Sequence, residues 1–397
     1  MSNLAILTAT RAEWGLLRPI VHAIQARGVE VRVLVTGMHL SATFGNTANE
    51  VRADGAPVDV TIPILVDSDS PSGASKTMAL AMSGFADYFA RRRPDALLVL
   101  GDRYETLAVC CAALNERIPI FHLYGGETTE GAIDEAVRHA ITKMSWLHFT
   151  STEAYRKRVI QLGEDPTRVF NVGAVGVENA LTMDLMSHEQ LEESLGTTIK
   201  CPYAVMTYHP VTLESESPVA KLESLLAVVS RHPEITFLAT KANADAGGRA
   251  INARLGEFAT DHGNLLLFDS LGSLRYLSAL KNAAFVIGNS SSGLLEAPAF
   301  GVPTVNIGAR QRGRVRPASV IDCAEDVASI EDAVVKALST DFRSSLLGME
   351  NPYGAGSTSE LVASVISDVL GRSIDLRKKF YDIDFGLGEK EIHGVQG

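Results

Sequence analysis

The sequence predicts an α/β protein with two doubly wound parallel sheets that face each other across a cleft. Short apolar segments alternate with helix-length segments through both halves of the chain, as in parallel sheets covered by helices on both faces. Polar residues follow these segments where the strands would end, which is where open α/β sheets bind ligands. At 397 residues and 46% apolar content, the chain is long enough for two such domains.

The composition excludes several classes of partner. The net charge of −11 argues against nucleic acid or an anionic membrane as the main partner. No apolar run reaches the roughly 18 residues that a membrane helix needs, and we expect a cytoplasmic protein without a signal peptide. The four cysteines show neither zinc spacing nor a pairing pattern, so we expect reduced thiols and no metal site.

The first half opens with a buried strand over residues 4–7, a polar turn and a helix from Ala12. Arg11 lies in that turn, at the carboxyl end of the strand, and we interpret it as a phosphate contact rather than a solvated turn residue. A second strand is predicted over 30–36. The segment 37–75 is rich in Gly, Ser, Asp, Pro and Thr, and should hold a strand or two and loops near the ligand.

A helix over 78–89 and a fully apolar strand over 96–100 come next. Asp102 follows this strand and, like Arg11, lies at a strand terminus. It could simply cap the following helix. We favour a functional role, because Gly101 leaves room for a ligand to approach the backbone.

The strand over 118–123 leads into a segment crowded with polar groups. The paired glycines Gly125 and Gly126 allow a sharp loop that could bring Glu127 and Asp134 toward one cavity. Asp134 could instead be an ordinary first-turn acid, and Arg138 is expected on another side of that helix. If these carboxylates share a site with Asp102, at least one holds a proton at neutral pH, which provides acid and base together. Strands over 147–150 and 169–171 complete a sheet of six or seven strands.

The second half repeats the pattern, with strands predicted over 203–208, 236–240, 265–268, 284–287 and 303–307. His209 follows the first of these strands, and Asn243 lies in the polar loop after the second. Three serines follow Asn289, at the expected N-terminus of a helix that continues through Glu296. Such a terminus offers unpaired N–H groups and a positive dipole end, which favour a phosphate, although an ordinary serine cap is the alternative.

Four arginines, the first of them Arg310, lie within residues 310–316 of this acidic chain. A solvated basic loop is one interpretation. Because the loop shares a sheet edge with the serines, we favour an arginine that neutralises phosphate through bidentate hydrogen bonds. We divide the chain into Rossmann-like domains at 1–176 and 177–365 and a C-terminal tail at 366–397, whose aromatic residues should pack on the first domain or a second subunit.

These motifs resemble the hydrolysing UDP-N-acetylglucosamine 2-epimerases of bacterial sialic-acid synthesis. The resemblance runs through nearly all of the chain, in TRAEWG, VTGMHL, LGDRYE, GGETTEGAIDEAVRHAITKMS, GNSSSGLLE and NIGARQRGRVRPASVID. It implies the glycosyltransferase-B arrangement of two domains, a UDP-sugar substrate, no cofactor, and a homodimer or higher homo-oligomer.

Position by position, the resemblance implies that the UDP moiety is held by Arg11, His209, Asn243, Ser290, Ser291, Glu296 and Arg310. The acid–base carboxylates would be Asp102, Glu127 and Asp134. His209 would also offset charge on the leaving diphosphate. Tyr124 is a departure, because several related epimerases carry a glutamate there, and Glu127 could take over part of that role.

The implied reaction is an anti elimination of UDP from UDP-N-acetylglucosamine to 2-acetamidoglucal, followed by hydration to N-acetylmannosamine. Other functions stay open at this point. One is a non-hydrolysing 2-epimerase, and another is a hydrolysing epimerase of UDP- or GDP-N,N'-diacetylbacillosamine. A glycosyltransferase of the same fold and a non-catalytic sugar-nucleotide sensor are the remaining alternatives.

Overall fold

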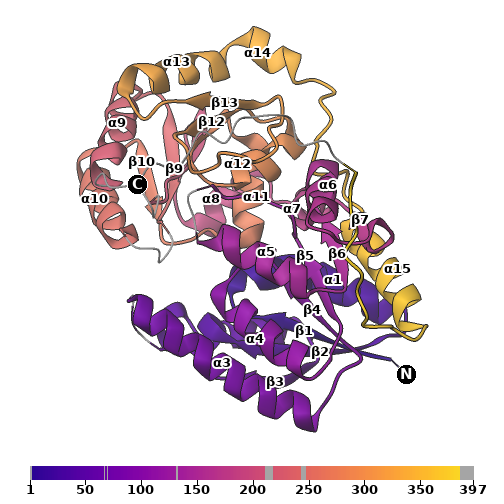
Figure 1. Ribbon diagram of the computed structural model, residues 1–397. Coiled ribbons are helices and arrows are strands. Elements are labelled where there is room, and N and C mark those ends of the chain that lie inside the picture. The colour runs from indigo at the N-terminus through magenta and orange to yellow at the C-terminus, as the bar shows by residue number, and fades with distance from the viewer. Residues whose placement is uncertain are drawn as a thin grey trace, which may run out of the picture.

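The computed structural model describes residues 2–66, 68, 70–130, 133–210, 218–242 and 247–384. These residues form two α/β domains, one above the other in Figure 1. The first sheet has the strand order β3-β2-β1-β4-β5-β6-β7, and the second has β10-β9-β8-β11-β12-β13. All the pairs of strands are parallel. The predicted doubly wound fold is therefore confirmed in both halves.

The first sheet comprises β1 (Asn3–Thr8), β2 (Glu30–Thr36), β3 (Val58–Ile62), β4 (Ala96–Leu100), β5 (Ile120–Leu123), β6 (Leu147–Thr150) and β7 (Val169–Asn171). Its helices are α1 (Arg11–Ala26), α2 (Ala48–Ala53), α3 (Pro71–Arg91), α4 (Tyr104–Asn115), α5 (Asp134–Met144) and α6 (Glu153–Gln161). Short 3-10 helices are η1 (Gly37–Leu40), η2 (Ala42–Phe44) and η3 (Pro166–Arg168). The segment 37–75 thus adds one strand, β3, at the sheet edge.

The second sheet comprises β8 (Tyr203–Thr207), β9 (Thr236–Thr240), β10 (Leu265–Phe268), β11 (Phe285–Gly288), β12 (Thr304–Ile307) and β13 (Val320–Cys323). The remaining helices are α7 (Val175–Thr182), α8 (His188–Leu195), α9 (Pro218–Arg231), α10 (Gly248–Asp261), α11 (Gly272–Asn282), α12 (Ser292–Leu295), η4 (Ala297–Phe300), α13 (Val327–Leu338), α14 (Thr340–Ser345) and α15 (Thr358–Leu370). Strand β13 was not predicted. It is a short edge strand with one buried residue, Ile321, so its apolar signal is weak.

Successive side chains of the central strands enter cores on opposite faces of each sheet. In β1, Leu4 and Ile6 pack on the face that α1 covers, while Ala5 and Leu7 pack on the face that α3 and α4 cover. This two-sided burial explains why the strands are apolar without interruption rather than alternating.

The last helix belongs to the first domain by its packing. Val362 and Ile366 of α15 share a core with Leu4 and Leu17, and α15 lies beside α1 at the lower right of Figure 1. Residue 366, where the tail was predicted to begin, therefore lies inside a helix that packs on the first domain. Whether the domain boundaries lie at 176 and 365 stays a prediction.

The tail after α15 also lies on the first domain. Lys378 Nζ lies 2.6 Å from Glu164 Oε2, and the Tyr381 amide donates to the Gly163 carbonyl at 3.0 Å. The ammonium of Lys143 lies 5.0 Å from the ring centre of Phe380. Phe380 and Tyr381 nevertheless remain 62% and 43% exposed, so whether their rings pack on the first domain or a second subunit stays a prediction. Phe385 lies outside the described residues.

Candidate active site between the two domains

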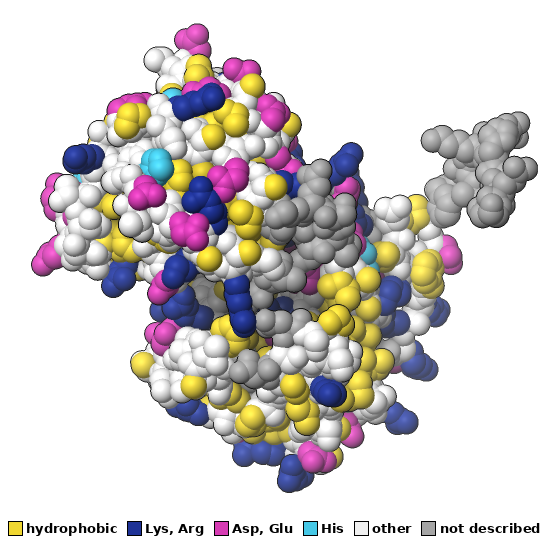
Figure 2. Space-filling view, turned by 90° about the vertical axis from the view of Figure 1, so that its left-hand side faces the viewer, with side chains coloured by type: hydrophobic (Ala, Val, Ile, Leu, Met, Phe, Trp, Pro, Cys, Tyr) yellow, Lys and Arg dark blue, Asp and Glu magenta, His cyan; other side chains and the backbone are white. Residues whose placement is uncertain are grey.

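A cavity of about 600 Å³ lies between the two domains. Figure 2 shows the molecule hollowed between its two lobes, with Lys and Arg side chains at the rim. Among the residues predicted to hold UDP, four line this cavity: Arg11, His209, Ser290 and Glu296. They come from both domains, at or just beyond the carboxyl ends of strands, as expected for a doubly wound fold.

The turn after β1 is fixed by a capping box. Glu13 accepts hydrogen bonds from the amides of Ala9 and Thr10 at 2.7 and 3.2 Å, and the Thr10 hydroxyl accepts from the Glu13 amide at 3.2 Å. Arg11 follows this turn, and its Nη2 donates to Ser270 Oγ of the second domain at 2.6 Å. Arg11 therefore links the two domains at the cavity.

His209 is held against the serine loop by Asn289. The Asn289 side chain accepts from the His209 amide at 2.7 Å and donates to the His209 carbonyl at 2.8 Å. The close approach of β11 to β8 requires glycine at 288, because its φ is +132° and a Cβ would overlap the Thr207 carbonyl. These contacts bring the ends of β8 and β11 to one place.

The helix after the serines is shorter than predicted. Helix α12 covers only Ser292–Leu295, and Glu296 ends it before the 3-10 helix η4 begins. The prediction that one helix continues through Glu296 is therefore wrong. Pro298 explains the change, because proline lacks an amide donor and disfavours α geometry at the residue before it. With a single helical turn, binding of a phosphate would depend on individual N–H groups and cations rather than on a long helix dipole.

Glu296 lies where the two domains meet. Burial raises its pKa to about 7, the neighbouring Ser292 side chain and the charge of Arg314 act to lower it, and the charge of Glu127 raises it further. A Cβ at Gly176 would overlap Glu296 Oε1. The carboxylate is thus in close contact with the start of α7 and near charged groups of both domains.

The other predicted UDP contacts have different outcomes. Arg310 Nη1 donates to the Asn289 carbonyl at 3.1 Å, beside the serine loop. Ser291 is the cap residue that precedes α12. Asn243 lies outside the described residues. Arg310 and the serine loop are therefore brought together as predicted, although their contact with a nucleotide stays a proposal.

Asp102 pairs with a buried arginine that sequence analysis missed. Arg138 is 1% exposed and contacts Asp102 through Nη2. Its guanidinium also donates to Glu135 Oε2 and the Glu127 carbonyl at 3.0 Å and to Thr129 Oγ1 at 2.9 Å. One side chain thus joins the end of β4, the loop after β5 and the first turn of α5. In the sequence, Arg138 could have been noticed from its spacing of three residues from Glu135, at which opposite charges on a helix pair.

Glu127 is also paired with a guanidinium. Its side chain is 6% exposed, Ser151 Oγ donates to Oε1 at 2.7 Å, and Arg314 Nη1 of the second domain lies 3.4 Å from Oε2. The loop that holds it needs glycine at 126, because a Cβ there would overlap the Tyr155 carbonyl. Sequence analysis expected carboxylates that share a proton, but Asp102 and Glu127 each face a positive charge instead.

The predicted acids Asp102, Glu127 and Asp134 are not among the described residues that line this cavity. Asp134 begins α5, in the helical first turn that was the alternative to a functional role. Glu127 nevertheless reaches the domain interface, where Arg314 of the second domain lies 3.4 Å from its carboxylate. The charge of Glu127 also acts to raise the pKa of Glu296, which lines the cavity.

Tyr124 is part of the domain interface. Its backbone has a φ of +68°, and its hydroxyl accepts from the Val175 amide at 2.9 Å. Burial raises the pKa of the phenol far above its usual range. Tyr124 therefore remains a neutral hydrogen-bonding group rather than a base.

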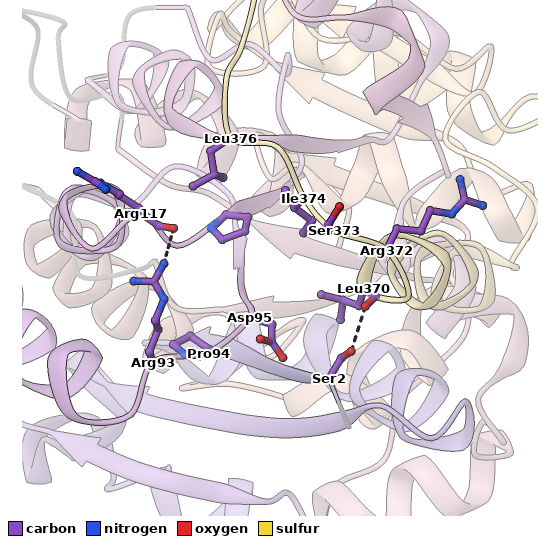
Figure 3. A pocket seen from close by; sticks show the side chains of 11 residues that line it. Ser2, Arg93, Pro94, Asp95, Arg117, Leu370, Arg372, Ser373, Ile374 and Leu376 are labelled. Carbon is purple, nitrogen blue, oxygen red and sulfur yellow. Dashed lines mark hydrogen bonds between the residues drawn. The ribbon is translucent and has the colours of Figure 1, made fainter.

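A second cavity, of about 630 Å³, lies at the amino-terminal edge of the first sheet (Figure 3). The Ser2 hydroxyl donates to the Leu370 carbonyl at 3.0 Å, and Arg93 Nη2 donates to the Arg117 carbonyl at 2.7 Å. The side chains of Arg117 and Arg372 extend away from each other in Figure 3. We interpret this cavity as a packing seam between the sheet and the chain after α15, because ligands of such sheets bind at the opposite edge.

Two further searches concern the described residues only. No three His, Cys, Asp or Glu side chains there gather closely enough to hold a metal ion. None of the helices in those ranges combines the length and apolar character needed to cross a membrane.

Comparison with known proteins shows the family of the chain. Residues 22–367 match the model of the UDP-N-acetylglucosamine 2-epimerase family. The chain belongs to this family. The predicted resemblance is therefore confirmed at the level of the 2-epimerases, whose characteristic arrangement of two domains this chain shares.

Three relatives match most of this chain. The GDP/UDP-N,N'-diacetylbacillosamine 2-epimerase (hydrolyzing) of Campylobacter jejuni is 40% identical over 86% of this chain and 88% of its own. The polysialic acid biosynthesis protein P7 of Escherichia coli is 37% identical over 96% and 98%. The UDP-N,N'-diacetylbacillosamine 2-epimerase (hydrolyzing) of Legionella pneumophila is 35% identical over 89% and 92%.

Solved structures of the epimerase family confirm the fold. The UDP-GlcNAc 2-epimerase of Neisseria meningitidis, bound to UDP-GlcNAc, has a TM-score of 0.79 at 18% identity, over 93% of this chain and 100% of its own. The enzyme of Methanocaldococcus jannaschii, in complex with UDP-GlcNAc and UDP, has a TM-score of 0.76 at 17% identity, over 92% and 99%. The two domains thus have the predicted glycosyltransferase-B arrangement.

Proposed function

We propose that this member of the family is a hydrolysing 2-epimerase, which converts UDP-N-acetylglucosamine and water to N-acetylmannosamine and UDP for sialic-acid synthesis. One observation carries the proposal: a cavity lined by Arg11, His209, Ser290 and Glu296 lies between the domains, and the acid Glu127 of the first domain pairs with Arg314 of the second. A sugar nucleotide held by the second domain would then present its hexose to acids of the first. Two relatives above 30% identity are named as hydrolysing enzymes, which supports hydrolysis.

The leaving diphosphate is the first chemical requirement. His209 and the serine loop lie together through Asn289, and Arg310 donates to the Asn289 carbonyl. Cations and N–H groups arranged in this way would offset the charge that grows on the leaving oxygen. Cleavage of the C1–O bond can then run ahead of proton removal at C2, and this order is needed because a C–H beside an acetamide is far less acidic than a carboxylic acid.

The carboxylates would act on the hexose. They stabilise positive charge at C1, remove the C2 proton, and later deliver a proton to the opposite face of C2 while water adds to C1. Each positioned acid or base contributes typically about 10²–10⁴-fold to the rate. For this chemistry the hexose must lie between Glu296 and Glu127.

Closing of the domains would limit the access of water. The bond between Arg11 and Ser270 crosses between the domains at the cavity. Reversible closing there would admit the substrate, then exclude bulk solvent and retain the glucal until one water molecule adds. A homodimer or higher homo-oligomer and a cytoplasmic location stay predictions.

A second candidate differs in its sugar. The Campylobacter and Legionella relatives are named for N,N'-diacetylbacillosamine, the 4-acetamido-6-deoxy counterpart of the substrate proposed above. Both sugars carry the 2-acetamido group and the C2 proton that the mechanism needs. Competition between the two UDP-sugars at equal concentration distinguishes these candidates, since the preferred substrate is consumed first.

Incubation with UDP-N-acetylglucosamine in deuterated water tests the proposed reaction. We expect free N-acetylmannosamine with deuterium at C2, together with UDP, in NMR spectra of the products. Release of UDP-N-acetylmannosamine would instead show a non-hydrolysing epimerase. Free sugar without deuterium at C2 would contradict elimination and addition, and transfer of the sugar to an acceptor would show a glycosyltransferase.

A further inference from the structure

Arg314 of the second domain reaches an acid of the first. It lies in the loop after β12, its side chain is 13% exposed, and its Nη1 lies 3.4 Å from Glu127 Oε2. Burial acts to lower the pKa of Arg314, but the charge of Glu127 acts in the other direction and the pKa lies above its usual value. The guanidinium therefore keeps its positive charge in a nearly closed environment.

The loop that carries Arg314 is anchored on both sides. On the nucleotide side, Arg310 Nη1 and Gln311 Nε2 donate to the Asn289 carbonyl at 3.1 and 2.8 Å. On the side of the first domain, the Val315 amide donates to the Tyr155 hydroxyl at 3.0 Å. The backbone around Arg314 thus connects the serine loop directly to the domain that holds the acids.

A second tyrosine completes this anchor. Tyr353 donates to the Val315 carbonyl at 3.0 Å, and its hydroxyl lies 3.2 Å from that of Tyr155. Both tyrosines are fully buried. Both the N–H and the C=O of Val315 are hydrogen-bonded. The backbone position from which the neighbouring Arg314 side chain extends is therefore fixed.

The other contacts of Arg314 do not explain its burial. Its Nε is buried without a hydrogen-bond partner among the described residues, and Glu127 is its ion-pair partner there. A buried ion pair is weak evidence for stability, because desolvation of the two charges can exceed their attraction. In the same loop, Arg312 is 75% exposed and lies 3.6 Å from Glu130. The exposed Arg312–Glu130 ion pair shows that this loop can contact an acid of the first domain without burying an arginine.

We propose that Arg314 is a positioning residue that holds the carboxylate of Glu127 toward the sugar. Ser151 fixes one carboxylate oxygen and Arg314 the other, so the plane of the carboxylate is set from two sides. Arg314 belongs to the loop that also carries Arg310, so neighbouring residues of one loop would serve the diphosphate and this acid. The inference rests on the proposed function and adds a residue to it.

The test compares three variants with the wild type. R314A should lower kcat on the order of 10²-fold, the loss typical of a misplaced reacting group, while the affinity for UDP measured by calorimetry stays unchanged. R314K should lose less. R312A removes the same charge from the same loop at an exposed position and should keep the wild-type rate.

Two further readouts separate positioning from a purely structural role. Added guanidinium at millimolar concentration should restore part of the kcat of R314A and leave that of E127Q unchanged. In the E127Q background, R314A should cause little further loss, because the two substitutions remove one interaction. Thermal melts check the fold, and R314M, which keeps the apolar stem, replaces R314A if R314A does not fold.

Several outcomes would overturn the inference. An unchanged kcat for R314A would do so, as would equal losses of rate in the wild-type and E127Q backgrounds. A loss of UDP affinity equal to the loss of rate would make Arg314 a ligand of the nucleotide instead. Turnover by the wild type is measured first with both UDP-sugars: its absence contradicts the proposed function and the inference with it, whereas normal wild-type turnover confines any failure to Arg314.

Discussion

At the scale of single residues, guanidinium groups organise the candidate acids. Asp102 contacts the buried Arg138, and Glu127 lies between Ser151 and Arg314. The sequence gives no indication that Glu127 pairs with Arg314, because this pair forms only where the two domains meet. Sequence analysis could therefore identify the acids but not the charges that face them.

Asp102→Asn tests the role of the first acid. Asparagine keeps the shape of the side chain but removes its charge and its ability to accept a proton. We expect C2 deuterium exchange and kcat to fall by at least about 10²-fold, with unchanged affinity for UDP in calorimetry as evidence of an intact fold. Exchange at the wild-type rate would reject a role for Asp102 at C2.

Glu296 predicts a pH dependence of stability. Its pKa rises from 4.5 to about 7 in the folded protein, mainly through burial. The folded state therefore binds more protons than the unfolded state between these values, and the contribution of Glu296 to stability falls as the pH rises through this window. We expect the difference in unfolding free energy between wild type and Glu296→Gln to decrease from about pH 4.5 to pH 7 and then to level off. Denaturant unfolding of both proteins without ligand, repeated across this pH range, measures the difference in unfolding free energy. A difference that does not change with pH would contradict a raised pKa for Glu296.

At the scale of elements, the helices and strands agree with the prediction where both faces of a sheet are buried. They differ from it where a single residue sets the end of an element. The buried strands could be predicted because both faces of each sheet are covered. The length of α12 depended on Pro298, and edge strand β13 has little apolar pattern. The prediction placed Arg138 on another side of its helix. The sequence could not show otherwise, because the partners of Arg138 outside the helix come from two other segments.

Gly288→Ala tests the junction of β11 with β8. A methyl group there would overlap the Thr207 carbonyl, and a φ of +132° is unfavourable for alanine. We expect weaker binding of UDP in calorimetry, because the serine loop and His209 are displaced together. Gly256→Ala is the control: this glycine in α10 has no atom near its added Cβ, and alanine should stabilise the helix by about 0.5–1 kcal/mol. Wild-type affinity for UDP in Gly288→Ala would contradict this account of the junction.

At the scale of the whole molecule, the two domains meet through polar contacts around the cavity. Arg11 donates to Ser270, Asn179 of α7 donates to the Gly15 carbonyl at 3.0 Å, and Glu127 pairs with Arg314. Interfaces of this kind allow domains to move relative to each other. The cleft itself could be predicted from the repeated strand pattern, but its closing contacts could not, because they join residues far apart in the chain.

The central claim is that the second domain holds the nucleotide while acids of the first domain act on the hexose. A crystal structure of the Asp102→Asn variant with UDP-N-acetylglucosamine tests it most directly, because slow turnover would preserve the substrate. We predict that the diphosphate contacts His209 and Arg310 and that C2 of the hexose lies within about 3.5 Å of Glu127 or residue 102. A hexose that points away from both, with the nucleotide bound as predicted, would contradict the claim.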